Sequence, residues 1–88
     1  MDRYQKELQR LRPDDEVQMV EKDQLGYNFI YTAGHGYLCV PRADRFYRIA
    51  CAIREYGYLG TFAVYLEEDC EVPEFFKKVK ELLDPSWD

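Results

Sequence analysis

Residues 27–41 read YNFIYTAGHGYLCVP. Aromatic and β-branched residues recur along 27–32 and return along 37–40, a pattern typical of β-strands. The short glycine-containing connection between them predicts a β-hairpin, and Pro41 closes its second strand. His35, the one histidine of the chain, lies in this connection with glycine on both sides. Glycine removes neighbouring side chains and permits a positive φ, so we expect the imidazole to be exposed.

Three segments have the apolar period of a helix. Residues 2–12 begin with a capping aspartate and carry a narrow apolar stripe, which predicts a peripheral helix. Residues 43–56 place apolar side chains at i, i+3, i+4 and i+7, and Gly57 suits a left-handed cap after this helix. Residues 73–83 begin at a proline, and they leave Trp87 in a short tail.

The element order α-β-β-α-β-α predicts a single two-layer α+β domain over the whole chain, with the helices on one face of a small sheet. The sheet has three strands, near 27–32, 37–40 and 59–66. It has four if the weak alternation at Val17 and Met19 forms an edge strand. The sequence does not decide whether the sheet is mixed or antiparallel. If the strand near 59–66 pairs beside 37–40, we expect a parallel pair and a right-handed crossover.

One core should join the apolar faces of the second helix, the third strand and the last helix. Its expected members are Phe46, Ile49, Ile53, Phe62, Val64, Leu66, Phe76 and Val79.

Composition limits the classes of function. The formal net charge of −5 argues against a general nucleic-acid binder, since phosphate contacts need a positive surface. No apolar run approaches the ~20 residues that span a bilayer, and the N-terminus is polar. Three cysteines without a CxxC pair, Cys39, Cys51 and Cys70, are typical of reduced thiols. We therefore expect a soluble cytoplasmic protein that does not bind membranes.

Two charged segments stand out. Arg42, Arg45 and Arg48 recur every three residues, which predicts a solvated helix face that pairs with acidic residues. The run Glu67-Glu68-Asp69-Cys70-Glu71 follows the third strand, and it suits the positive end of the last helix. It lacks the alternating ligands and central glycine of a calcium loop.

An enzyme would use His35 as a general base, a carboxylate from residues 67–69 to orient it, and Cys39 or Cys70 as the nucleophile. A metal site is a second alternative, because His35 and these two cysteines could supply three ligands. Their spacing matches no known ligand pattern, and no cofactor-binding motif is present.

A binding interpretation explains more of the sequence. Tyrosine offers a large amphipathic contact area with few rotors, and dense carboxylates steer a basic partner. We expect a protein partner with a basic surface, such as a nucleic-acid-binding protein, while the oligomeric state stays open. The expected contact residues are His35, Tyr37, Tyr58, Glu67, Glu68 and Asp69.

Three segments together resemble a group of small uncharacterised proteins from bacteriophages and mobile elements, which share a GHG-aromatic-L-x-V element followed by YLEEDCE. The resemblance covers roughly residues 27–80. It implies a bacterial host and action by binding a host protein, of which counter-defence inhibitors are one class; it implies no catalytic residue and no cofactor. The matching segments are Gly34-His35-Gly36-Tyr37-Leu38-Cys39-Val40-Pro41, Tyr56-Gly57-Tyr58-Leu59-Gly60 and Tyr65-Leu66-Glu67-Glu68-Asp69-Cys70-Glu71.

Overall fold

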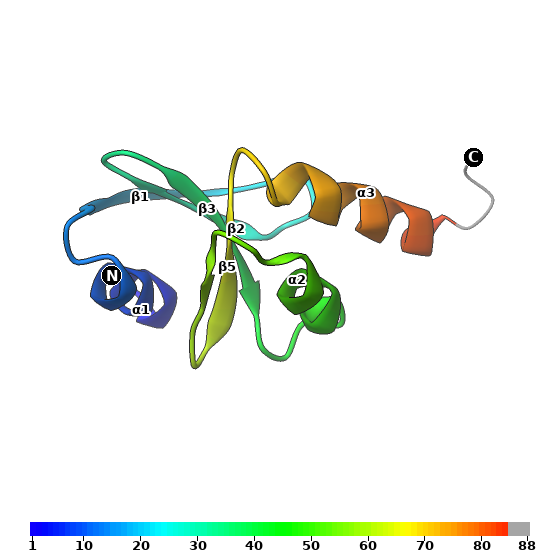
Figure 1. The fold of residues 1–88 in the computed structure, drawn as a ribbon, viewed down its shortest axis with the longest axis horizontal. Coiled ribbons are helices and arrows are strands. Elements are labelled where there is room, and N and C mark those ends of the chain that lie inside the picture. The colour runs from blue at the N-terminus through cyan, green and yellow to red at the C-terminus, as the bar shows by residue number, and fades with distance from the viewer. Residues whose placement is uncertain (85–88) are drawn as a thin grey trace.

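A computed structural model describes residues 1–84; the tail that holds Trp87 lies outside them. The described part contains three helices and five strands (Figure 1). In chain order they are α1 (Arg3–Leu11), β1 (Val17–Lys22), β2 (Asn28–Thr32), β3 (Gly36–Pro41), α2 (Tyr47–Ile53), β4 (Tyr58–Leu59), β5 (Ala63–Glu67) and α3 (Val72–Leu83).

The strands form one antiparallel sheet in the order β1-β2-β3-β5-β4. The β2–β3 hairpin and the edge strand at Val17 are confirmed. The expected parallel crossover is wrong, because the apolar run near 59–66 is two strands. The chain reverses between β4 and β5, where the Gly60 amide donates to the Ala63 carbonyl at 2.9 Å. This reversal makes β5 antiparallel to β3.

Helices cover both faces of the sheet, so the expected two-layer arrangement with helices on one face is wrong. In Figure 1, α1 and α2 lie on opposite sides of the strands. Alternation along β3 explains this: Leu38 faces α2 and α3, whereas Tyr37 faces α1, and both side chains are buried. A sheet that is apolar on both faces needs cover on both. Helix α1 is therefore integral, and its Leu8 is completely buried.

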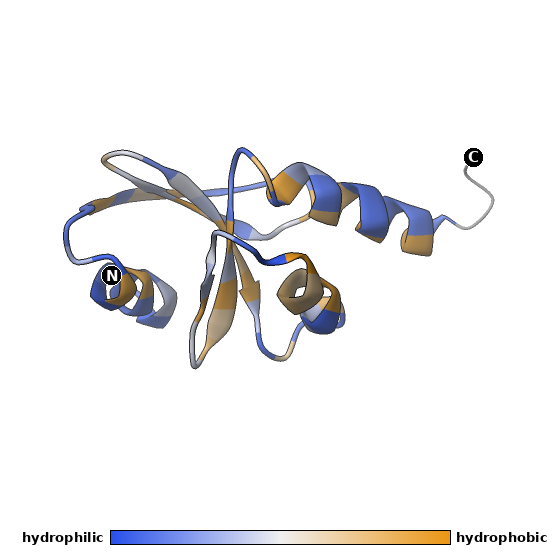
Figure 2. Ribbon diagram, in the orientation of Figure 1, coloured by the Kyte–Doolittle hydropathy of each residue, from blue (hydrophilic) through white to orange (hydrophobic). Residues whose placement is uncertain are grey.

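The core beneath α2 and α3 contains Val64, Leu66 and Val79 as predicted. On α3 the fully buried phenylalanine is Phe75, one position before the expected Phe76. Phe76 is partly buried at the margin of this core, as are three residues expected within it, Phe46, Ile49 and Ile53. Apolar and hydrophilic residues alternate along α3, as its single buried face requires (Figure 2).

Phe62 does not belong to this core. It precedes β5 and is half-buried, and the guanidinium of Arg3 lies 5.2 Å from the centre of its ring. The turn before β5 points Phe62 toward α1, because the expected continuous strand is interrupted there.

Helix α2 is shorter than the expected 43–56. Before it, the Asp44 carboxylate accepts the Phe46 amide at 2.9 Å and holds a turn. Arg42 and Arg45 therefore precede the helix. Within residues 1–84, no ion pair joins these arginines or Arg48 to the acidic run.

After α2, the carboxylate of Glu71 accepts the amides of residues 55–57 and of Glu67. These bonds draw the chain out of helical geometry after Ile53. Gly57 does not have the expected positive φ. Its role is close approach, since a Cβ there would overlap the Tyr65 carbonyl oxygen. The acidic run thus contributes one internal carboxylate to the fold.

We predict that Phe75→Ala lowers the free energy of unfolding by about 3–5 kcal/mol, because it empties a fully buried site. Phe62→Ala should cost less, since its ring lies outside both cores. Urea unfolding of the two variants measures the difference. Equal losses would contradict the placement of Phe62.

Glu71→Ala should destabilise the domain by roughly 3 kcal/mol or more, because several amides in the α2–β4 loop lose their acceptor. Exposed Glu74, in the first turn of the helix that Glu71 precedes, is the matched control, and Glu74→Ala should change little. The same urea experiment tests this pair. Similar losses in both variants would show that Glu71 acts through helix charge rather than through the loop.

Candidate functional site

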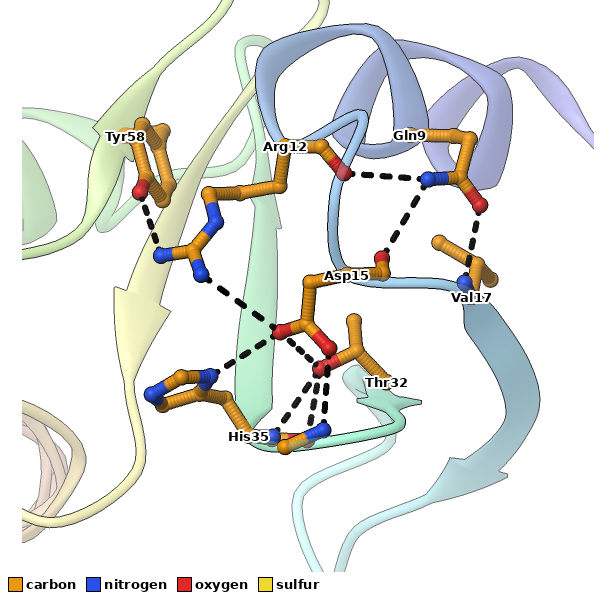
Figure 3. A network of polar contacts seen from close by, with 8 residues as sticks. Gln9, Arg12, Asp15, Val17, Thr32, His35 and Tyr58 are labelled. Carbon is orange, nitrogen blue, oxygen red and sulfur yellow. Dashed lines mark hydrogen bonds and ion pairs between the residues drawn. The ribbon is translucent and has the colours of Figure 1, made fainter.

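The candidate site is built around the β2–β3 connection, and Asp15 organises it from the α1–β1 loop (Figure 3). Asp15 is buried. Its carboxylate accepts the Thr32 hydroxyl at 2.6 Å and the Gly34 amide at 2.9 Å. The His35 Nδ1 atom lies 2.9 Å from the same carboxylate. Three groups of the hairpin turn therefore converge on one aspartate.

Helix α1 holds Asp15 in place through its last turns. The side-chain amide of Gln9 donates to the carbonyls of Arg12 and Asp15, and its oxygen accepts the Val17 amide at 2.8 Å. These bonds fix the loop that joins α1 to β1. They also place the first residue of the edge strand, so the loop cannot move without the strand.

Arg12 links Asp15 to β4, the edge strand on the opposite side of the sheet from β1. One guanidinium nitrogen donates to the Tyr58 hydroxyl at 2.9 Å, and the other lies 3.9 Å from the Asp15 carboxylate. The Tyr58 ring packs on Tyr37, with ring centres 5.8 Å apart. Tyr37 is 1% exposed. It therefore supports Tyr58 from within the core and does not itself form the contact surface expected of it.

Asp15 is held in its charged form. The hydrogen bonds from Thr32 and then from His35 lower the pKa of its carboxyl from 3.8 to about 2. A carboxylate only accepts, so the proton of the neutral imidazole sits on Nδ1. This leaves Nε2 as the outward nitrogen of a side chain that is 43% exposed. His35 is exposed as expected, although one edge of its ring contacts Asp15.

The turn does not use the positive φ that its glycines permit. Neither Gly34 nor Gly36 has a positive φ; Gly26 is the glycine that does within residues 1–84. Gly36 is needed for close packing instead, since a Cβ there would lie 2.6 Å from the Phe29 ring.

The acidic run lies next to this turn. Tyr37 pairs with Glu67 in the β3–β5 register, and the Glu68 amide donates to the Gly36 carbonyl at 3.0 Å. Glu68 and Asp69 are exposed, and Glu67 is half-buried. Antiparallel pairing therefore brings the predicted histidine and the predicted carboxylates to one end of the sheet. It does not bring them into contact, because Asp15 has taken the position expected for an orienting carboxylate.

The cysteines do not complete a catalytic site with His35. Cys39 is buried against α1, and burial raises the pKa of its thiol to about 12. Cys70 is exposed, and desolvation and the nearby Glu67 raise the pKa of its thiol. Both shifts disfavour the thiolate that a nucleophile requires. In the part of the chain that the structure describes, no three His, Cys, Asp or Glu side chains gather as metal ligands.

Sequence analysis did not identify Asp15 as a site residue. The signal lay in the β1–β2 pairing: Val17 pairs with Thr32, so the residue two positions before Val17 must lie beside the end of β2. Gln9 and Arg12 gave no comparable signal. Their partners become neighbours only when α1 packs beneath the sheet.

Comparison of the chain with protein-family models, with curated proteins and with solved structures found no match. No helix within residues 1–84 is long and apolar enough to cross a bilayer.

The low pKa of Asp15 predicts acid sensitivity. Because the folded pKa lies below the ordinary value, the unfolded chain binds more protons in this range, and stability falls as the pH drops from about 4 to about 2. We expect Asp15→Asn to be less stable at neutral pH and to lose this part of the pH dependence. Urea unfolding between pH 2 and 7 measures it, with exposed Asp14→Asn as the control. A variant with the parental pH profile would contradict the assignment.

Proposed function

We propose that this chain is a small acidic binding domain that recognises a basic surface on a host protein. The observation that supports it is the position of the acidic run. Glu68 and Asp69 project at the end of the sheet beside the His35 turn. Within the described residues, no lysine or arginine forms an ion pair with residues 67–69. Their charge is therefore available to a partner.

The sequence resemblance extends this proposal to the setting. A protein of a bacteriophage or mobile element would act in the cytoplasm of its bacterial host, and inhibition of a host defence protein is one such action. Many defence proteins handle nucleic acid, so they carry the basic surfaces that an acidic domain can occupy. Fixed geometry at the His35 turn favours recognition over loose charge attraction, because Asp15 orders the turn before binding.

Affinity capture from a bacterial lysate tests the proposal. The bait is the tagged full chain, and mass spectrometry identifies the captured protein. We expect the triple variant E67A/E68A/D69A to fold and to capture less of it, with the difference shrinking as salt rises. A triple variant of equal charge, D14A/E74A/E81A, changes exposed carboxylates elsewhere and should capture normally. Equal loss in both triples would attribute capture to net charge and contradict the proposed surface.

His35→Ala separates recognition from folding. Asp15 keeps its bonds to Thr32 and Gly34 in this variant, so the turn should persist and the melting temperature should fall only slightly. Capture should nevertheless weaken, since the exposed edge of the imidazole is lost. Unfolding of the variant, or capture at the parental level, would remove His35 from the proposed surface.

A further inference from the structure

One part of the sheet face that carries α2 and α3 is left without a helix. The buried core beneath these helices is built on β3 and β5; it includes no residue of β1, and Phe29 of β2 packs only against its margin. In Figure 1, α1 lies beneath the β1 end of the sheet, and α2 and α3 lie toward the other end. We call this uncovered area the open face; it consists of Met19, Glu21, Phe29, Tyr31 and Glu68, which lie around the buried Gly36.

The strand register brings the open face together. Met19 pairs with Tyr31, Glu21 with Phe29, and Tyr31 with Gly36. Met19 is 48% exposed, and the two aromatic rings are half-buried. Ile30, between these rings in sequence, points into the core on the α1 side. Met19, Phe29 and Tyr31 thus form an apolar strip within the open face, and the described part of the chain leaves this strip partly accessible.

Two carboxylates border the aromatic rings. The rings of Phe29 and Tyr31 lie 4.9 Å apart at 51°, and the Tyr31 hydroxyl donates to Glu21 at 3.3 Å. On the other side, a Cβ on Gly36 would lie 2.6 Å from the Phe29 ring and 3.1 Å from a Glu68 oxygen. Glu68 and the edge of Phe29 therefore meet above Gly36.

This arrangement has no cation of its own. Within residues 1–84, the arginines that stack on aromatic rings do so elsewhere, on Phe46, Tyr58 and Phe62. No lysine or arginine of that range forms an ion pair with Glu21 or Glu68. Burial and Glu21 raise the pKa of Tyr31, so its hydroxyl stays a neutral donor. Two carboxylates beside two π faces favour a positive ligand with a flat apolar surface.

We propose that the open face binds an arginine side chain of a basic partner protein, with the guanidinium stacked on Phe29 and Tyr31 and paired with Glu68 or Glu21. Arginine fits better than lysine, since its planar group stacks on rings and donates to carboxylates in two directions. This proposal rests on the proposed function, and it names the side chain that the partner supplies. A second copy of this chain is the competing occupant, because α3 exposes Lys77, Lys78 and Lys80.

NMR titration of the full chain tests the proposal. The probe is the peptide acetyl-Gly-Arg-Gly-Arg-Gly-amide, and acetyl-Gly-Gln-Gly-Gln-Gly-amide is its uncharged control. We expect the arginine peptide to shift the aromatic signals of Phe29 and Tyr31 and the amide signal of Glu68, and the control to shift none of them. Shifts confined to other residues, or equal shifts with both peptides, would overturn the proposal.

Variants supply the second arm. Tyr31→Leu keeps apolar bulk and removes the π face, and Glu21→Gln and Glu68→Gln remove one charge each from exposed positions. Each should weaken binding of the arginine peptide about two- to fivefold. Tyr56→Leu and Glu81→Gln change exposed residues elsewhere and should bind normally. If Tyr31→Leu does not fold, the two glutamine variants alone test the proposed arginine site. Parental affinity in both glutamine variants would overturn the proposal.

The two proposals can fail separately. If the parental chain captures no protein from the lysate but binds the arginine peptide at the open face, the proposed function alone is contradicted. Tyr31→Leu and Glu21→Gln test the open face separately, because they leave residues 67–69 intact. Capture that needs residues 67–69 but survives both of these variants contradicts the arginine site alone. Signals of the open face that shift on dilution of the unliganded chain would assign this surface to a second copy, and would overturn the proposal.

Discussion

Three buried carboxylates hold this domain together by accepting hydrogen bonds from segments far away in the sequence. Glu7 of α1 accepts the amides of Thr61 and Phe62 and the hydroxyl of Tyr65. Asp15 accepts groups of the β2–β3 turn, and Glu71 accepts amides of the α2–β4 loop. Each carboxylate thus fixes a segment whose amides have no partner in a helix or strand. Removing one would leave those amides unpaired, which costs more than the bonds themselves contribute.

The need for buried hydrogen-bond acceptors divides the carboxylates into those that stabilise the fold and those that can bind a partner. Glu71 ends the acidic run and points inward, whereas Glu68 and Asp69 point outward. Asp15 points inward as well, and it orders His35 before any partner arrives. A dense acidic sequence therefore divides into internal acceptors that fix loops and external charges at one end of the sheet.

Charge is also distributed along the length of the molecule. The His35 turn and the open face share Glu68 near one end of β3. Helix α3 extends away from the sheet, and it exposes Lys77, Lys78 and Lys80 (Figure 1). A basic partner would be attracted to the first region by its exposed carboxylates, whereas the lysines of α3 are offset by Glu74 and Glu81 on the same helix. The open face would then convert this attraction into a specific contact, because stacking requires a planar cation.

The sequence by itself determined the local elements. Alternation found the hairpin around His35, and the capping aspartate and the helix-starting proline placed α1 and α3. The sequence also suggested that His35 lies near Glu67, Glu68 and Asp69, but only as a hypothesis. Tertiary structure decided what local patterns could not: the reversal at residues 60–62, the cover on both faces, the pairing of His35 with Asp15, and the burial of Tyr37. These features depend on contacts between residues distant in the chain, and periodicity reports only the environment of each segment on its own.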